Sequence, residues 1–590
     1  MRNFFKIFTA SCLGTIGALI ILIFIIVVFG LWRGKQLPSI KKNAILQIEF
    51  KGPIPEMTDN IAESSSFSFQ QNNALGLRDI KQLIHKASSD NNIAGIVING
   101  GSSGIPPATA LSIRNSLSDF RKAGKFVYAY DEYYSQLGYF LSSTADSIFL
   151  NPNGSVEFRG FAVSIPHFKE LMDDLGVDMN VFYAGDFKSA TEPYRRKDMS
   201  EQNKIQTRSY LNSILDAYLQ EIARSRNIDA DHLFDLMDEL KIQNGKDALT
   251  HGLVDSLSYK SQFLDFLTTK LNIEKRKDIN FIKLAEYAAS LEAKEEKTFH
   301  KNKIAILYAE GDILFEDDSK GVISENRYEK VCDQILEDED IKAVVLRVNS
   351  PGGSSLTSDI IWQRIEELKA HNKFVIASYG DYAASGGYYI SCGADSIIAQ
   401  KNTLTGSIGV YSMFPKIKNL VSDKLGIHFD TVKTTNYAIV GSPYFDLNET
   451  EKKVFERSTN KIYDKFLSRV AAGRNMSKDE AHVVAQGRIW SGTQASMNGL
   501  IDGIGDLDKA IDIAANRLNL DAYQIVEYPI VERTFFDELL GNVMPSAGIN
   551  YFTNPIQEIM PQELQAKIVF LKKWASTKEP LARLPFTLEY

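Results

Sequence analysis

The sequence predicts an α/β protein made of two tandem βαβ repeats, and three observations support this prediction. Short apolar segments of strand length alternate with amphipathic stretches of helical length along most of the chain. The segments of the first half recur in the second half at a nearly constant offset. The 590 residues are enough for two such domains. Because helices join the strands, each half is expected to contain right-handed crossovers and a largely parallel sheet.

The first element is an apolar segment near the N-terminus. Leu13 to Trp32 contains no charged residue over 20 positions, which is long enough to cross a bilayer as a helix. No Ala-x-Ala-like cleavage site follows, so we predict an uncleaved transmembrane anchor after a cytoplasmic tail of residues 1–12. A long, cleaved signal peptide is the alternative. The positive-inside rule alone does not place the body outside, and leans the other way, because basic residues flank both ends: Arg2 and Lys6 before the segment, and Arg33, Lys35, Lys41 and Lys42 after it.

The first repeat is predicted over residues 43–260. Its first three strands are expected at short apolar runs: Ala44–Ile48, Ile93–Ile98 and Phe126–Ala129. Two short motifs, Ala145-Asp146-Ser147 and Gly252-Leu253-Val254-Asp255, mark its later part. Residues 261–302 are expected to form a helical connector, since the stretch that leads into the second repeat is charged and helix-prone.

The second repeat is predicted over residues 303–518. Its corresponding strands are expected at Ile304–Tyr308, Ile341–Val348 and Phe374–Ala377. Ala394-Asp395-Ser396 matches the first motif of the first repeat at an offset of 249 residues, and Gly499-Leu500-Ile501-Asp502 matches the second at an offset of 247. The similarity between the halves stops after Leu518. The tail, residues 519–590, contains proline, aromatic and amphipathic segments from which we predict no role.

Composition excludes several classes of function. The net charge of −8 and the lack of a basic block in the body argue against nucleic-acid binding. The three cysteines, Cys12, Cys332 and Cys392, form neither a disulfide framework nor a Cys-x-x-Cys site. The eight histidines show no metal-ligand spacing. We therefore expect no metal and no cofactor.

The segment from Ser378 to Tyr389 carries the first candidate for chemistry. Phe374–Ala377 is expected as a buried strand, Gly380 and Asp381 as a turn, and Ala384 onward as the start of a helix. Ser385 is then at a strand-to-helix turn between small neighbours, where a substrate backbone can approach closely. The amide of Gly386 can point at a developing oxyanion from the helix N-terminus. The alternative is a helix-capping or packing serine.

Comparison of the repeats locates a second candidate. The offset of 249 places Gln136 opposite Ser385, with Ser135 one position away but without the following Gly-Gly. The first repeat instead carries Lys188, opposite which the second repeat has Ala438, or Tyr437 after a one-residue shift. One half thus keeps a serine and the other a lysine, as though one site were divided between two copies.

A serine hydroxyl needs a base, and burial can make a lysine amine neutral enough to serve. His371 is the nearest histidine in sequence, on the far side of the preceding strand, and a more distant one remains open as the base. The alternative for Lys188 is a solvated loop lysine.

Two further segments of small residues are candidates for the same site. Asn349-Ser350-Pro351-Gly352-Gly353 ends a buried strand, and the amide of Gly353 can join that of Gly386 in an oxyanion hole. An ordinary Pro-Gly turn is the alternative. Ser407, within Thr405–Val410, is a candidate for orienting Lys188, with a turn serine as the alternative.

Together these residues resemble the long, two-repeat form of the signal peptide peptidase A family, also called protease IV. The matching motifs are Asn-Ser-Pro-Gly-Gly at 349–353, Ala-Ser-Gly-Gly-Tyr-Tyr at 384–389, Leu-Thr-Gly-Ser-Ile-Gly at 404–409 and Phe-Lys-Ser-Ala-x-Glu-Pro at 187–193. The resemblance covers roughly residues 43–520 and includes the N-terminal anchor. It implies a fold similar to the Clp protease proteolytic subunit and the crotonases, with Ser385 as nucleophile and Lys188 as general base of a serine endopeptidase.

The resemblance also implies a setting. Members of that family are single-pass proteins of the bacterial inner membrane, with a periplasmic catalytic body, and they form homo-oligomers, here expected as tetramers. They degrade signal peptides and similar apolar segments. Two rival functions remain: a crotonase-like acyl-CoA enzyme with the same fold, and a non-catalytic membrane scaffold.

Overall fold

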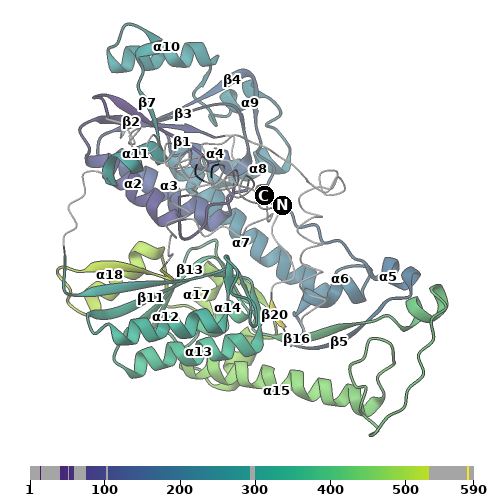
Figure 1. Ribbon diagram of the computed structural model, residues 1–590. Coiled ribbons are helices and arrows are strands. Elements are labelled where there is room, and N and C mark those ends of the chain that lie inside the picture. Colours follow the sequence, from purple (N-terminus) through teal and green to yellow (C-terminus); the bar gives the residue numbers. More distant parts are fainter. Residues whose placement is uncertain are drawn as a thin grey trace, which may run out of the picture.

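The computed structural model describes Gly14, Gly17 and residues 40–50, 52–58, 75–100, 104–292, 299–530 and 581–583. Apart from those two glycines, the anchor predicted at 13–32 lies outside the described residues. Within the described ranges, no helix is both long enough and apolar enough to cross a membrane. Figure 1 shows two lobes, each built around a sheet, with the long helix α7 (Glu201–Arg226) running between them.

The upper lobe contains a six-stranded sheet in the order β6-β4-β3-β2-β1-β7, in which every neighbouring pair is parallel. Its strands are β1 Ala44–Glu49, β2 Ile93–Asn99, β3 Phe126–Tyr134, β4 Ser147–Val156, β6 Ser256–Leu257 and β7 Phe281–Lys283. Its helices are α2 Leu77–Ser89, α3 Pro107–Lys122, α4 Gln136–Ser142, α8 Ala230–Asp238, α9 Gly245–Thr250, α10 Lys260–Leu271 and α11 Leu284–Glu292, with the short 3-10 helix η2 Arg276–Asp278.

The lower lobe contains an eight-stranded sheet whose main path is β17-β15-β13-β11-β8-β19, with β14 beside β13 and β18 beside β14. All its pairs are parallel except β15 with β17. Its strands are β8 Lys303–Glu310, β11 Ile341–Ser350, β13 Phe374–Ala384, β14 Ser396–Ala399, β15 Leu404–Gly406, β17 Ile489–Ser491, β18 Gly503–Ile504 and β19 Gln524–Tyr528. Its helices are α12 Glu325–Glu337, α13 Ser355–Ala370, α14 Gly386–Ser391, α15 Glu449–Gly473, α16 Lys478–Val484, α17 Gly492–Met497 and α18 Leu507–Arg517.

A third sheet combines both repeats. Its order is β10-β9-β12-β20-β16-β5, and β5 of the first half pairs antiparallel with β16 of the second. Its strands are β5 Asp178–Ala184, β9 Asp312–Ile313, β10 Val322–Ile323, β12 Gly352–Ser354, β16 Val410–Lys416 and β20 Leu581–Arg583. Short helices lie near it: α5 Lys169–Leu175, η1 Ser189–Thr191, α6 Glu192–Arg195 and the π-helical turn η3 Leu420–Lys424. The segment after β5 is therefore brought against the second repeat.

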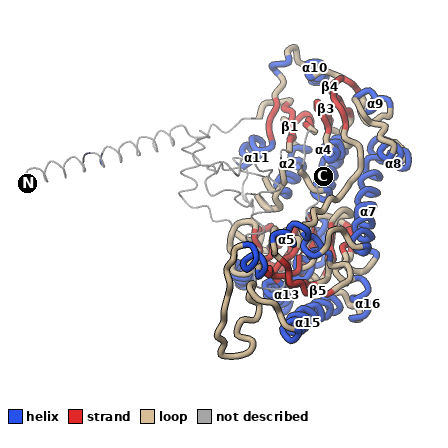
Figure 2. The backbone as a smooth tube through the Cα atoms, turned by 90° about the vertical axis from the view of Figure 1, so that its right-hand side faces the viewer, coloured by secondary structure: helices blue, strands red, loops and turns tan. Residues whose placement is uncertain are grey.

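The apolar runs form the predicted strands because helices cover both faces of each parallel sheet, so nearly every position must be apolar. Along β11, for example, the side chains from Ala343 to Val348 are all buried. Two large cores result, one on each central sheet. Figure 2 shows the helices lying on the flanks of the red strands in both lobes. The α/β class and the two repeats are thus confirmed.

Two local predictions were wrong. Gly380 and Asp381 do not form a turn but lie inside β13, which continues to Ala384 by pairing with β15. The polar Asp381 is tolerated there because its carboxylate accepts hydrogen bonds from the first repeat. The helix begins at Gly386 and not at Ala384. In addition, the segment expected as a connector contributes β7 to the first sheet, and the tail contributes β19 to the second.

Buried polar contacts join the repeats. Arg347 on β11 forms a two-point ion pair with Glu56 of the first repeat, with both N···O distances 2.9 Å and both side chains 2% exposed. The Asp381 carboxylate accepts hydrogen bonds from the amides of Ala108 and Thr109 in the first turn of α3 (3.0 and 2.9 Å). Since buried charges need such partners, these contacts fix how the lobes meet.

Candidate active site

The structure brings Lys188 and Ser385 together within one chain. Lys188 follows β5 in the first repeat, and Ser385 lies between β13 and α14 in the second. The Lys188 Nζ is 2.8 Å from the Ser385 Oγ, and both side chains are buried. Nζ is also 3.0 Å from both the Oγ and the carbonyl oxygen of Ser407. Three of the residues singled out from the sequence therefore meet at one point.

Burial lowers the pKa of the Lys188 ammonium from 10.5 to about 7, because the charged form loses its hydration. A neutral amine has two N–H donors and one lone pair. The two acceptors of Ser407 match the two donors, which leaves the lone pair for the Ser385 hydroxyl proton. The arrangement is chemically suited to removing a proton from Ser385.

Ser385 has an unusual backbone conformation. Its φ of 56° and ψ of −113° lie in a region that side-chain-bearing residues rarely adopt. Its amide donates to the Gly406 carbonyl (2.8 Å), which holds the residue against β15. Such strain is concentrated at functional sites. Here it aims the hydroxyl at Lys188 at the start of α14.

The two candidate oxyanion glycines are close together. A Cβ on Gly386 would come within 3.1 Å of the Gly353 amide nitrogen and 2.7 Å of the Ser358 Oγ. A Cβ on Gly353 would collide with the carbonyl of Ile313 at 1.9 Å. Glycine is therefore required at position 353, and a side chain at position 386 would have to displace Ser358. The chain beside Ser385 thus approaches β12 closely.

A loop of the second repeat supports the backbone of Lys188. The Gln486 carbonyl accepts a hydrogen bond from the Phe187 amide (2.9 Å). Gly487 has a φ of +76°, and a Cβ on it would be 2.7 Å from the Lys188 amide nitrogen. The amide of Gly487 donates to Ile408 and that of Ser407 to Arg488, both at 2.7 Å. One loop thus contacts both Lys188 and the segment that carries Ser407.

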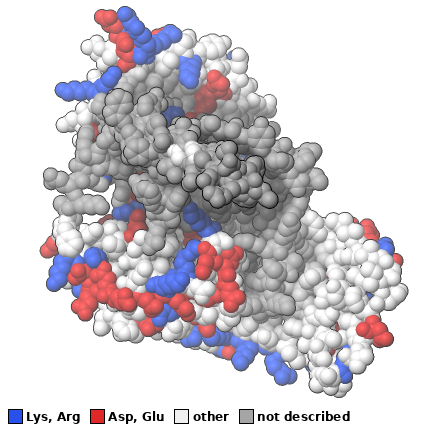
Figure 3. All heavy atoms as spheres, in the orientation of Figure 1, with Lys and Arg blue, Asp and Glu red and all other residues white. Residues whose placement is uncertain are grey.

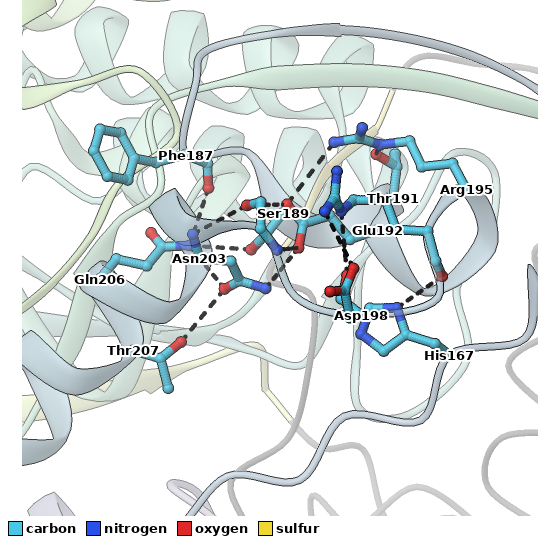
Figure 4. Close-up of polar contacts among 12 residues, drawn as sticks. His167, Phe187, Ser189, Thr191, Glu192, Arg195, Asp198, Asn203, Gln206 and Thr207 are labelled. Carbon is cyan, nitrogen blue, oxygen red and sulfur yellow. Dashed lines mark hydrogen bonds and ion pairs between the residues drawn. The ribbon is translucent and has the colours of Figure 1, made fainter.

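A buried polar network lies behind the lysine loop (Figure 4). Glu192 accepts hydrogen bonds from the Ser200 amide and from the Asn203 side chain, and Gln206 donates to the Phe187 carbonyl and to Ser189. Ser200 also caps the N-terminus of α7. The long helix between the lobes is therefore tied to both sides of Lys188. The sequence analysis missed Gln206, Gln486 and Gly487, since none belongs to a recognisable motif.

The first repeat has a different residue at the position that corresponds to Ser385. Tyr139 and Tyr388 make equivalent hydrogen bonds, to the carbonyls of Leu253 and Leu500 (2.9 Å each), which supports the alignment of Gln136 with Ser385. The Gln136 Oε1 accepts from the amides of residues 159 and 160, so this side chain fastens a loop. Ser135, the alternative counterpart, caps α4 through the Gly138 amide.

The other candidates lie elsewhere. His371 is exposed at the end of α13, and its Nδ1 is 2.9 Å from the Glu367 carbonyl of the same helix. Tyr437, one of the two residues aligned with Lys188, is 49% exposed. Within the described ranges, no group of three His, Cys, Asp or Glu side chains could hold a metal ion.

Comparisons with known proteins identify the family of the chain. The model of "Peptidase family S49" matches twice, at residues 119–274 and 367–521. The chain is 35% identical over 458 residues to "Protease 4" of Haemophilus influenzae, a match that covers 75% of this chain and 73% of that protein. It is 32% identical over 549 residues to "Protease 4" of Salmonella typhi, covering 89% and 85%.

Solved structures also match, and one of them illustrates the extent of the similarity. "ClpP1 from Listeria monocytogenes" is 14% identical, with a TM-score of 0.22, over 34% of this chain and 91% of that one. The Clp-like and crotonase-like form of each repeat stays a prediction.

Proposed function

The chain belongs to peptidase family S49 and is a serine peptidase, and we propose that Ser385 is its nucleophile and Lys188 its general base. The observation that carries this proposal is the buried contact of 2.8 Å between the Lys188 Nζ and the Ser385 Oγ. The lowered pKa of Lys188 supports it, because a base must be neutral at working pH.

The proposed reaction has two steps. Neutral Lys188 takes the proton of Ser385, whose Oγ attacks the peptide carbonyl, and the amides of Gly353 and Gly386 stabilise the oxyanion. Lys188 then protonates the leaving amine. Water, with its proton removed by Lys188, hydrolyses the acyl-enzyme and regenerates Ser385. Ser407 is assigned the role of orienting the Lys188 amine through its two oxygens.

The substrates we propose are extended, apolar peptides such as cleaved signal peptides. Strand β20 supports an extended substrate, because it pairs antiparallel with β12 at Gly353 and with β16 at Tyr411. These two edges, which β20 occupies here, hold an extended backbone beside the glycine of the proposed oxyanion hole, so a substrate strand would take the place of β20. The apolar character of the substrate rests on the resemblance to protease IV.

The setting is also part of the proposal. We place the chain in a bacterial inner membrane, with residues 1–12 cytoplasmic, 13–32 as the anchor and the body periplasmic. The body is divided into a first repeat at 43–260, a connector at 261–302, a second repeat at 303–518 and a tail at 519–590. This division assigns Lys188 and Ser385 to different repeats.

We further propose a homo-oligomer, a tetramer by resemblance. The segment between β16 and α15 forms an arm at the lower right of Figure 1. This arm supports self-association, since in Figure 3 its surface carries few charged side chains. Several of its apolar side chains are about half exposed or more: Leu425, Ile427, Phe429, Val432 and Tyr437. Exposed apolar side chains gathered in one segment are typical of protein contacts.

The test is cleavage of an apolar signal-peptide-like substrate by the full chain in detergent. Ser385→Ala and Lys188→Ala are expected to abolish turnover, whereas Lys169→Ala, on the exposed α5, retains it. Full activity in the Lys188 variant would exclude the dyad. Turnover of an acyl-CoA thioester in place of the peptide would favour the crotonase-like function, and inactivity of the folded, assembled wild type towards both would favour a scaffold.

A further inference from the structure

Gln206 lies where the two repeats meet behind the site. It is on α7 and fully buried. Its Nε2 is 3.1 Å from the Phe187 carbonyl and 3.1 Å from the Ser189 Oγ, the residues on either side of Lys188. Its Oε1 accepts a hydrogen bond from the amide of Ile489, at 3.1 Å, in the second repeat. One side chain therefore touches the lysine loop and the opposite lobe at once. Figure 4 shows its contacts on the side of the lysine loop.

The orientation of this amide is fixed by its partners. A backbone carbonyl can only accept, so Phe187 selects the amino end of the glutamine. A backbone amide can only donate, so Ile489 selects the oxygen end. A flipped amide would lose both bonds inside a buried region, where unpaired polar groups are costly. The side chain is thus held in one orientation.

The partner of the oxygen end leads directly to the nucleophile. Ile489 begins β17, which pairs antiparallel with β15, where Ile489 is opposite Gly406. The Gly406 carbonyl holds the Ser385 amide. The residue before Ile489, Arg488, accepts a hydrogen bond from the amide of Ser407. A displacement of Ile489 relative to Gln206 would therefore move both serines relative to Lys188.

We propose that Gln206 is a positioning residue that sets the Lys188 loop in register with Ser385 and Ser407 across the boundary between the repeats. This inference rests on the proposed dyad and adds a residue to it. Gln206 contacts the lysine through the backbone on either side of it. Its effect is therefore expected on the chemical step and on the protonation of Lys188, not on peptide binding.

The test is steady-state kinetics of the full chain across pH with the Gln206→Met variant. Methionine keeps the length of the side chain but removes both hydrogen-bonding ends. We expect kcat to fall about 10- to 100-fold, as for small misplacements of catalytic groups, with KM within about twofold of wild type. The midpoint of the acid limb is expected to rise, because a looser lysine loop admits water and stabilises the ammonium form.

Gln494→Met is the matched control. Gln494 also joins the lobes, since its Nε2 donates to the carbonyl and Oγ of Ser209 on α7 (3.2 and 2.9 Å), but it does not touch the lysine loop. We expect this variant to lose thermal stability while kcat and the pH midpoint stay at wild-type values. Gln206→Asn, whose amide is one methylene shorter, provides a milder variant if the methionine variant fails to fold, and its kcat is expected between those of wild type and Gln206→Met.

Equal effects of the Gln206 and Gln494 variants on kcat, with unchanged pH midpoints, would overturn the inference and leave Gln206 a structural residue. So would a Gln206 effect confined to KM. Failure of the dyad itself is recognised separately, because Lys188→Ala would then remain active whatever Gln206 does.

Discussion

At the scale of single residues, the site depends on two unfavourable states that the fold enforces. Lys188 is buried where its charged form loses hydration, and Ser385 holds a backbone conformation that costs about 1–3 kcal/mol for a residue with a side chain. Neither state benefits folding. Both prepare the proton transfer that the proposed mechanism requires. The stability of the surrounding core therefore has to offset the cost of these two states.

The pH dependence of activity follows from the state of Lys188. A lysine that acts as a base must be neutral, and burial places its pKa at about 7. We expect kcat to rise with pH and to level off above about pH 8, falling roughly tenfold for each unit below the pKa. The measurement is kcat from pH 5 to 10 with a peptide that has no titrating side chain. A rise centred near pH 10 would show that the lysine titrates as in water.

The protonation of Lys188 should also affect the free energy of unfolding, in a direction that follows from its lowered pKa. Between pH 7 and 10.5 the unfolded chain binds a proton at Lys188 that the folded chain does not, so the stability of the wild type rises with pH across that window. Each pH unit is worth about 1.4 kcal/mol. The Lys188→Met variant lacks this dependence. Its Tm is expected to exceed that of the wild type at pH 7.5, and this difference in Tm is expected to shrink by pH 9.5. A constant difference in Tm would mean that Lys188 is charged in the folded protein.

At the scale of elements, the loop of residues 485–488 fixes where the lysine lies. Its Gly487 faces the Lys188 backbone so closely that no side chain fits, and its Gln486 carbonyl binds Phe187. The same loop binds the segment of Ser407 through two backbone hydrogen bonds of 2.7 Å. The proposed base and the proposed orienting serine are thus held by one element, which belongs to the repeat that carries Ser385.

Gly487→Ala tests this role. The added methyl group would be 2.7 Å from the Lys188 nitrogen, which forces the lysine loop away from Ser385. We expect kcat to fall by at least about tenfold, since a displacement of 1 Å can cost about a hundredfold. Gly426→Ala is the control, because Gly426 also has a positive φ but has open space around its Cβ position. Comparable losses of kcat in both variants would attribute the effect to backbone strain alone.

The elements also show which features of the fold and of the candidate site could be predicted from the sequence. The strands were predictable because parallel strands buried on both faces need apolar runs, as in Ala343–Leu346. Ser385 and Lys188 were found because each lies among small residues and is missing from the other repeat. Gln206 carries no such signal, since its partner Ile489 is 283 residues away. Asp381 suggested a turn because the amides that satisfy it come from the other lobe.

At the scale of the whole molecule, the two repeats build one site. Lys188 and Ser385 are 197 residues apart in sequence, and α7, the third sheet and buried polar pairs hold their lobes together. A change in how the lobes dock therefore changes the distance between the Lys188 Nζ and the Ser385 Oγ. The family model matches both halves, yet neither half carries both groups.

Docking of the lobes is tested at the Arg347–Glu56 pair. Glu56→Gln leaves the Arg347 charge buried without its counter-charge, and breaking such a pair costs about 3–5 kcal/mol. We expect a clear loss in Tm and a lower kcat, since the lobes then separate more easily.

Lys401→Gln is the control. It removes an ion pair to Glu221 that also lies between the lobes, and the Lys401 side chain is 40% exposed. Exposed pairs contribute about 0–1 kcal/mol, so its Tm and kcat should stay near those of wild type. If Glu56→Gln lowered Tm but left kcat intact, the dyad would be held by local contacts alone. The lysine loop and the segment of residues 485–488 would then be enough to maintain it.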